Sequence, residues 1–281
     1  MRKMSPALNY FRARGNYAVC LAAVALLGLN LSFLSTFSST REAPEYCKVA
    51  LKTVDEGTLE GLSAYVISAP WLPFPYFHIV PQPESTLLTE GGFLDARGSF
   101  LMCEHLLFSA ILRQHNDMES VVIDVGGNAG VFTNLFASFP NVGQVYTFEA
   151  SPKTFKRLQA SVCVNDNVRK VHLFNCGVSE KDEIINLSHL WHSGQTTRVA
   201  TGGDVRVPSH PMDAVLLDKV KNHGHALAKA PVLMKLDCEG CELGALQGAT
   251  RMLRKYPPKY IFFEYTSGDP KDFLNILVRW V

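Results

Sequence analysis

The sequence lacks an excess of charge of either sign. Its 281 residues include 27 Lys and Arg and 26 Asp and Glu, which gives a formal net charge of +1. A nearly neutral chain has no broad basic field that attracts nucleic acid. Zinc-finger, homeodomain and RNA-stacking motifs are absent from the sequence as well. We therefore expect no nucleic-acid partner.

The chain also lacks internal repeats and low-complexity tracts. Their absence argues against a solenoid, a fibrous protein or a disordered chain. Hydrophobic residues make up 47% and charged residues 19% of the sequence, which is ordinary for a globular protein with a sizeable core. The length suits one large domain or two small ones.

Acidic residues are absent before Glu42, whereas five basic residues occur there: Arg2, Lys3, Arg12, Arg14 and Arg41. Residues 18–34 carry no charge and are mostly Ala, Val and Leu. About 17 to 20 apolar residues span a bilayer, and basic residues before the span favour a cytosolic N-terminus. We expect a cytosolic tail at 1–17, a signal anchor at 18–34 and a lumen-facing domain in the ER or Golgi. A cleaved signal peptide, giving a secreted protein, and an organellar transit peptide are the alternatives.

Cysteine usage is compatible with that destination. One of the seven cysteines, Cys20, lies in the expected anchor, and six remain: Cys47, Cys103, Cys163, Cys176, Cys238 and Cys241. An even number permits disulfides in an oxidising lumen, although buried thiols are an equally good interpretation. Asn186-Leu187-Ser188 is a glycosylation sequon that only a lumenal chain uses.

Residues 35–98 are expected to form a stem and an approach to the domain. Five prolines between 70 and 83 are interleaved with aromatic residues. Proline at this density excludes a regular helix and a central strand. The aromatic residues are expected to pack on the domain or to shape an acceptor groove.

The most informative stretch is Val121-Val-Ile-Asp124-Val-Gly126-Gly-Asn128-Ala-Gly130. An apolar run, a glycine-rich turn and apolar residues at helical spacing predict a buried strand, a tight turn and a helix. Such a turn brings the backbone and a helix N-terminus close to a nucleotide-like ligand. Gly126 permits the sharp turn, Gly130 permits close helix packing, and Asp124 is placed to bind turn amides or a bound amine.

A second strand, residues 145–148, ends at Glu149. An acidic residue about 20 positions after the turn is placed to bind both hydroxyls of a ribose. Ser151 and Pro152 suit the N-cap and first position of the next helix. A dinucleotide site needs G-x-G-x-x-G, whereas this motif has Asn128 and a shorter spacing to Gly130. The sequence therefore favours S-adenosylmethionine over NAD.

These motifs resemble the FkbM-type family of S-adenosylmethionine-dependent O-methyltransferases, whose first motif reads D-V-G-A-N-x-G. The likeness extends over roughly residues 99–266 and includes Phe148-Glu149, Pro211-Met212-Asp213 and Lys235-Leu-Asp237-Cys-Glu239-Gly-Cys-Glu242. The resemblance implies a Rossmann-like class I methyltransferase sheet in an α/β fold. It also implies that Gly177, at the end of the third strand, faces the adenine.

Acidic residues follow the expected fourth strand, at the sheet edge beside the methyl donor. O-methylation needs a base near the acceptor hydroxyl, and Asp237 or Glu239 is the candidate. Capping of the next helix by Glu239 and Glu242 is the alternative. Asp237-x-Glu239 would also suit a divalent cation, although we predict no metal. His189, His192 and His210 are further candidate bases. The Cys238-x-x-Cys241 spacing permits a local disulfide or two buried thiols.

The chain ends soon after the expected fifth strand, residues 260–265, and a helix from Asp269 onward. A seven-stranded methyltransferase sheet would add a β-hairpin, so we expect domain 99–281 to be C-terminally incomplete. An uncovered strand edge would then need a partner.

We therefore expect a membrane-anchored methyltransferase that acts on a hydroxyl of a glycan or of a small molecule. The alternatives are a Golgi-type glycosyltransferase that uses a nucleotide-sugar, or a degenerate, non-catalytic methyltransferase-like protein. Against the glycosyltransferase, the chain has no Asp-x-Asp motif. The oligomeric state is not predicted.

Overall fold

The computed structural model describes residues 10–12, 62–67, 76–81, 98–115, 119–189, 197–199, 203, 205–219, 227–264 and 270–278. The expected anchor at 18–34 and most of the expected stem lie outside these residues. Among the helices that the structure describes, none has the length and apolar character needed to cross a membrane.

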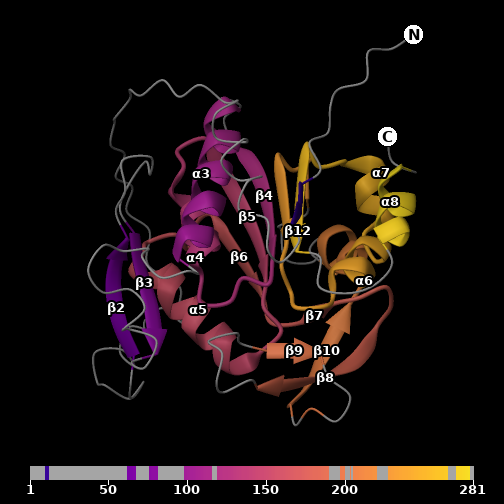
Figure 1. Ribbon diagram of the computed structural model, residues 1–281, viewed down its shortest axis with the longest axis horizontal. Coiled ribbons are helices and arrows are strands. Elements are labelled where there is room, and N and C mark those ends of the chain that lie inside the picture. The colour runs from indigo at the N-terminus through magenta and orange to yellow at the C-terminus, as the bar shows by residue number, and fades with distance from the viewer. Residues whose placement is uncertain are drawn as a thin grey trace.

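A six-stranded sheet forms the centre of the molecule (Figure 1). Its order is β1 (Tyr10–Arg12), β12 (Tyr260–Glu264), β11 (Leu233–Leu236), β4 (Ser120–Val125), β5 (Val142–Phe148) and β6 (Val171–Phe174). Every neighbouring pair is parallel. The predicted parallel Rossmann-like sheet is therefore confirmed.

The strand order reverses between β4 and β11. From β4 the chain moves outward to β5 and β6, and it then returns to place β11 on the other side of β4. In open α/β sheets, ligands bind outside the carboxyl ends of the strands at such a switch point. The turn after β4 and the acidic residues after β11 both lie there.

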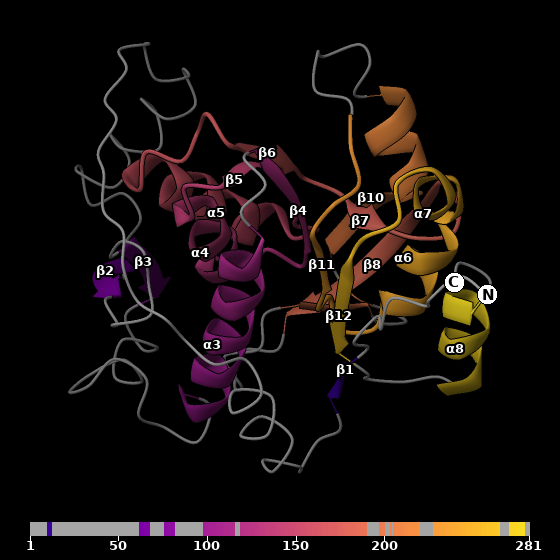
Figure 2. The ribbon, with the colours of Figure 1, turned by 90° about the horizontal axis from the view of Figure 1, so that it is seen from above.

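Helices cover both faces of the sheet (Figure 2). One face carries α3 (Gly98–Gln114), α4 (Val131–Ser138) and α5 (Pro152–Val164), and the other carries α6 (Glu242–Gln247), α7 (Thr250–Lys255) and α8 (Pro270–Val278). Val122 packs in the core under the first set, and Ile123 packs in the core on the other face. This burial on both faces explains why β4 is continuously apolar except at Asp124.

Capping explains where two of these helices begin. The Ser151 side chain accepts a hydrogen bond from the Thr154 amide at 3.3 Å, and Pro152 opens α5, as predicted. The Asp213 carboxylate accepts bonds from the backbone amides of Arg251 and Met252, each at 2.7 Å, in the first turn of α7. Asp213 is therefore a structural residue that fixes α7.

A second sheet lies between β6 and β11 in the chain and was not predicted. Its order is β7 (Gly177–Val178), β10 (Val205–His210), β8 (Glu183–His189) and β9 (Thr197–Val199). The π-helical segment η2 (Ala214–Lys219) follows it. Its longer strands, β8 and β10, carry many polar residues and lack the apolar run that predicted β4.

The approach segment contains an antiparallel pair, β2 (Leu62–Ile67) and β3 (Tyr76–Pro81). This pair forms a separate two-stranded sheet, and β3 lies against α4 and α5. Within the proline-rich segment, the described residues 76–81 thus contribute no central strand, as predicted.

The outer edge of β12 is paired over part of its length, contrary to the expectation of an uncovered edge. β1 lies parallel to β12, with Tyr10 opposite Phe262 and Arg12 opposite Glu264. In the described part of the chain, α8 follows β12 and no hairpin strand comes after it. β1 belongs to the expected cytosolic tail, and a tail across a bilayer from the domain cannot pair with β12. The pairing and the predicted topology therefore exclude each other.

Candidate active site

The turn after β4 adopts a backbone that few residue types tolerate. The φ angles are 82° at Gly126, 49° at Asn128 and 92° at Gly130. Glycine adopts positive φ freely, and Asn is among the side chains that visit this region most readily. The amides of Gly126 and Gly127 donate to the Phe148 carbonyl, each at 2.9 Å. Asn128 is thus a turn residue, and its positive φ sets the direction of its backbone amide.

Gly126 also brings the turn into contact with the end of β11. A Cβ atom on Gly126 would lie 1.9 Å from the backbone oxygen of Asp237. The Asp237 amide in turn donates to the Val125 carbonyl at 3.0 Å. The ligand turn and the segment that carries the acidic residues are therefore in direct backbone contact.

Glu149 connects the same turn to the end of β5. Its Oε2 accepts a hydrogen bond from the Asn128 amide at 2.9 Å, and its Oε1 accepts one from the Ser151 amide at 2.8 Å. Burial raises the pKa of the Glu149 carboxyl to about 7, although the Ser151 and Asn128 amides act in the opposite direction. The predicted site residue thus lies beside the turn as expected.

Asp124 lies near the end of β4, as predicted, but its polar partners come from α4 and β11. It is completely buried, and its Oδ2 accepts a hydrogen bond from the Thr133 hydroxyl at 2.7 Å. Its Oδ1 lies 3.7 Å from the Nζ atom of Lys235. Burial is the main reason that the pKa of Asp124 is raised, although Lys235 opposes it. Asp124 therefore supports the site from inside the fold, and the prediction of a direct ligand contact is corrected.

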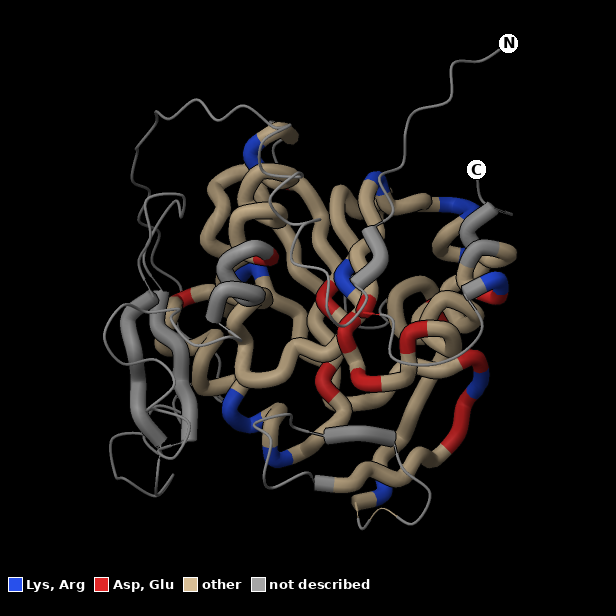
Figure 3. Tube along the Cα trace, viewed as in Figure 1, with Lys and Arg blue, Asp and Glu red and all other residues tan. Residues whose placement is uncertain are grey.

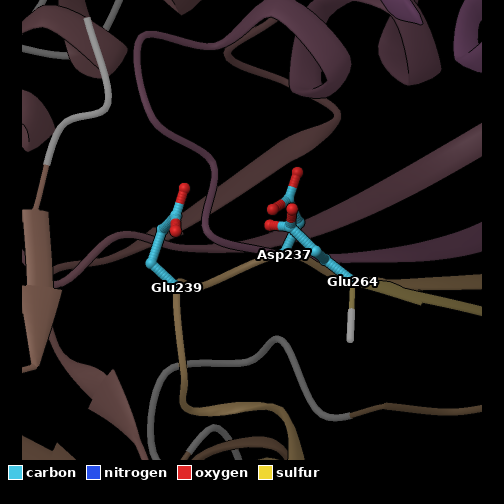
Figure 4. A group of neighbouring side chains, drawn as sticks. All are labelled: Asp237, Glu239 and Glu264. Atoms are coloured by element: carbon cyan, nitrogen blue, oxygen red, sulfur yellow. The ribbon is translucent and has the colours of Figure 1, made fainter. Parts of the chain in front are cut away.

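Three carboxylates meet where β11 and β12 end. Oxygen atoms of Asp237, Glu239 and Glu264 lie within 4.8 Å of one another. Figure 4 shows the three side chains directed to the same side, and Figure 3 shows acidic positions gathered in this part of the molecule. Such an oxygen cluster has the chemistry of a divalent-cation site as well as that of a proton acceptor.

Glu264 belongs to this cluster but was not among the predicted site residues. It is the last residue of β12, and only 6% of its surface is exposed. The available signal was its place after an apolar strand, because carboxyl ends of parallel strands share one sheet edge.

Two kinds of contact hold the loop between Asp237 and α6 in place: a disulfide and hydrogen bonds to Glu242. A disulfide joins Cys238 to Cys241, with a Cα–Cα distance of 5.5 Å. The Glu242 carboxylate accepts hydrogen bonds from the amides of Cys238 at 3.1 Å and Gly240 at 3.1 Å. Glu242 thus holds the loop, whereas Glu239 projects into the carboxylate cluster with a φ of 56°. The disulfide, one of two predicted alternatives, is present.

Two other candidates lie in the second sheet. Gly177 is buried in β7, and a Cβ there would lie 2.7 Å from the Ile185 side chain and 2.9 Å from the Ser209 hydroxyl. Its small size serves sheet packing, and its contact with the adenine stays a prediction. His210 is paired with Asp182 through its Nδ1 atom. The side chains of His189 and His192 lie outside the described residues.

This arrangement defines a class of protein. The parallel sheet has a switch point, and a glycine turn, an acidic residue at the end of the second strand and an acidic edge lie there. These are the features of a Rossmann-like methyltransferase fold. The chain matches the Methyltransferase FkbM domain over residues 124–279 and belongs to that family. The resemblance stated from the motifs is confirmed.

Two curated relatives are similar over part of the chain. Methyltransferase 1 of Beauveria bassiana is 27% identical over 146 residues, which are 46% of this chain and 58% of the relative. Hexuronic acid methyltransferase AglP of Haloferax volcanii is 26% identical over 168 residues, which are 59% of this chain and 65% of the relative. The chain thus spans less than two thirds of the length of either relative.

Among solved structures, a SAM-dependent methyltransferase from Agrobacterium tumefaciens aligns with 77% of this chain and 57% of its own. The sequence identity is 8% and the TM-score is 0.41.

Proposed function

We propose that the chain is an S-adenosylmethionine-dependent O-methyltransferase. The adenosyl group lies across the turn 126–130 with its ribose at Glu149, and the acceptor hydroxyl lies at Asp237 and Glu239. The observation that carries the proposal is the backbone contact between Gly126 and Asp237, because it joins the donor turn and the acceptor carboxylates in one unit.

The residues present fit the methyl donor. A carboxylate has about four lone-pair positions, and two backbone amides use two of them at Glu149, which leaves capacity for two ribose hydroxyls. Asp237, Glu239 and Glu264 supply negative charge beside a cationic ligand. When bound, the donor supplies an activated methyl group on a positively charged sulfur.

The chain itself has to remove the proton from the acceptor. An alcohol is too weakly acidic to ionise alone at neutral pH, so a positioned base accelerates the reaction. About 20% of the Asp237 side chain is exposed, so an acceptor can reach it. In the proposed step Asp237 takes the hydroxyl proton, the acceptor oxygen bonds to the methyl carbon, and the carbon–sulfur bond breaks with its electron pair left on sulfur. Glu239 orients the acceptor.

A glycan hydroxyl in the secretory pathway is the proposed acceptor, and a uronic acid is the first to test because one relative is a hexuronic acid methyltransferase. Two observations support an oxidising compartment. Cys238 and Cys241 form a disulfide, and Cys163 is disulfide-bonded as well. A single-pass anchor at 18–34 remains the proposed membrane attachment.

Glycosylation decides between that topology and the pairing of β1 with β12. Asn186 lies in β8 and is partly exposed. If the domain is lumenal, endoglycosidase is expected to increase the gel mobility of the protein from secretory cells, and Asn186→Gln is expected to abolish the shift. A protein that carries no glycan would favour the pairing, since it would leave residues 10–12 on the same side as the sheet.

Affinity for S-adenosylhomocysteine is expected to fall as the pH falls through 7. Ribose hydroxyls donate to the ionised carboxylate of Glu149, and burial raises the pKa of this group to about 7. Protonation at lower pH therefore competes with the ligand, and affinity should be roughly tenfold weaker at pH 6 than at pH 8. Calorimetry at both pH values measures this, and Glu149→Gln should remove the pH dependence. A pH dependence that survives in Glu149→Gln would assign it to another group.

Calorimetry also tests the function itself. S-adenosylmethionine and S-adenosylhomocysteine are expected to bind, and UDP- and GDP-sugars with Mn²⁺ are expected not to bind. Binding of only the nucleotide-sugars would replace the methyltransferase proposal with the glycosyltransferase alternative. Methyl transfer to uronic-acid oligosaccharides, followed by mass spectrometry, then tests the acceptor.

A further inference from the structure

Lys235 is a buried cation next to the acidic edge. Only 1% of its side chain is exposed. Its Nζ atom lies 3.2 Å from Asp237 Oδ2 and 3.7 Å from Asp124 Oδ1, and it stands 4.9 Å from the ring centroid of Phe132. A lysine is rarely buried to this degree unless its charge is paired, and Asp237 and Asp124 supply that pairing. The role of a buried cation at this place needs an explanation.

The ammonium group remains charged at neutral pH. Burial by itself lowers the pKa of Lys235, but attraction to Asp237, Asp124 and Glu104 outweighs burial, and the pKa is raised. A permanently protonated lysine cannot accept a proton from an acceptor hydroxyl. Lys235 is therefore excluded as the base, and its effect has to pass through its partners.

Strand geometry explains how the ammonium reaches Asp237. Lys235 lies directly opposite Asp124 in the pairing of β11 with β4, so their side chains share one face of the sheet. Asp237 follows two residues after Lys235, a spacing that keeps two side chains on the same face of a strand. With Thr133 bound to Asp124, polar contacts run from α4 along one face of the sheet to the carboxylate cluster.

We propose that Lys235 is a positioning residue, whose buried ammonium holds the carboxylate of Asp237 ionised and in the orientation that receives the acceptor proton. This inference rests on the proposed function, because it assigns Asp237 the role of base. It explains why a costly buried cation lies beneath the acidic edge: the attraction fixes a carboxylate that would otherwise be surrounded by like charges.

The decisive variant removes the ammonium group without leaving the negative charge of Asp124 buried and unpaired. Lys235→Met alone would bury an unpaired charge and threaten folding. The double variant Asp124→Asn with Lys235→Met removes one charge of each sign, and Asp124→Asn alone separates the contribution of Asp124. Lys170→Met is the matched control, because this partly buried lysine binds the carbonyls of Ala137 and Phe139 outside the proposed site.

The first measurement needs no substrate. The ¹³C signal of the Asp237 carboxylate, assigned by its loss in Asp237→Asn, is followed as a function of pH. In the double variant its protonation midpoint is expected to rise by about one pH unit or more, because an opposite charge this close favours the ionised form. Lys170→Met should leave the midpoint unchanged. An unchanged midpoint in the double variant would overturn the proposal.

The second measurement is a kinetic cycle with a uronic-acid oligosaccharide as acceptor. When Asp237 is unchanged, the double variant Asp124→Asn with Lys235→Met is expected to lower kcat about 100-fold, a typical contribution of a positioned base. Its affinity for S-adenosylhomocysteine should stay within about threefold of the parent. In the Asp237→Asn background, the same two substitutions should change kcat little, since Lys235 acts through Asp237.

Equal losses of kcat in both backgrounds would overturn the positioning role. Absence of methyl transfer by the unmodified protein would instead count against the proposed acceptor or function. The carboxylate titration would then still decide whether Lys235 holds Asp237 ionised, so the two failures are distinguishable.

Discussion

Replacement of Gly126 by alanine is expected to destabilise the fold and to abolish binding of the methyl donor. The backbone φ of 82° alone costs an alanine about 1–2 kcal/mol. The added Cβ would also lie 1.9 Å from the Asp237 carbonyl oxygen, a contact that forces the backbone apart. Overpacking of this kind adds roughly 1–3 kcal/mol. We expect the free energy of unfolding to fall by the sum of these costs.

Gly240 offers a matched control for this prediction. Its φ of 114° is also unfavourable for alanine, but a Cβ there would meet no atom within 4 Å. Gly240→Ala should therefore show the conformational cost alone, about 1–3 kcal/mol. Urea denaturation measures both variants, and calorimetry with S-adenosylhomocysteine measures the site. Equal effects of the two substitutions on both quantities would mean that the contact of Gly126 with Asp237 is unimportant.

Replacement of Glu149 by alanine is expected to produce the second large effect. It removes the acceptor of the Asn128 and Ser151 amides and the proposed acceptor of the ribose hydroxyls. Hydrogen bonds to a charged group contribute about 1.5–3 kcal/mol each. Affinity for S-adenosylhomocysteine should therefore fall roughly 30-fold or more.

Two controls separate lost ligand contacts from lost folding in the Glu149 variant. Glu149→Gln keeps the shape of the side chain and one acceptor oxygen, so it should lose less affinity than Glu149→Ala. Thermal unfolding without ligand reports the structural cost of the unpaired amides. Unchanged affinity in a folded Glu149→Ala protein would show that the ribose lies elsewhere.

The parts of the fold that could be predicted are those encoded by local signals. The apolar run before Asp124, the glycine turn after it and the Ser151-Pro152 start of α5 each correspond to a structure of a few neighbouring residues. Several motifs resemble those of the family and occur in the same order along the chain. This resemblance predicted the Rossmann-like sheet and the family. Glu149 was placed correctly because its distance along the chain from the turn is set by one strand–helix–strand unit.

The parts that could not be predicted depend on partners distant in sequence. Asp124 ends up inside the fold because Lys235, 111 positions later, lies opposite it in the sheet. Gly177 packs against Ser209, and β12 is bordered by a strand from the other end of the chain. Periodicity within a segment says which side chains share a face, but it does not say which strand becomes the neighbour.

The disulfide between Cys238 and Cys241 makes the acidic edge of the sheet sensitive to the redox conditions around the protein. As a disulfide, the two sulfurs fix the span of the loop in which Glu239 holds a φ of 56°. Reduction would remove that cross-link and leave the loop held by the hydrogen bonds from the Cys238 and Gly240 amides to Glu242. Strong reductant is therefore expected to lower the rate of methyl transfer more than it lowers the affinity for S-adenosylhomocysteine.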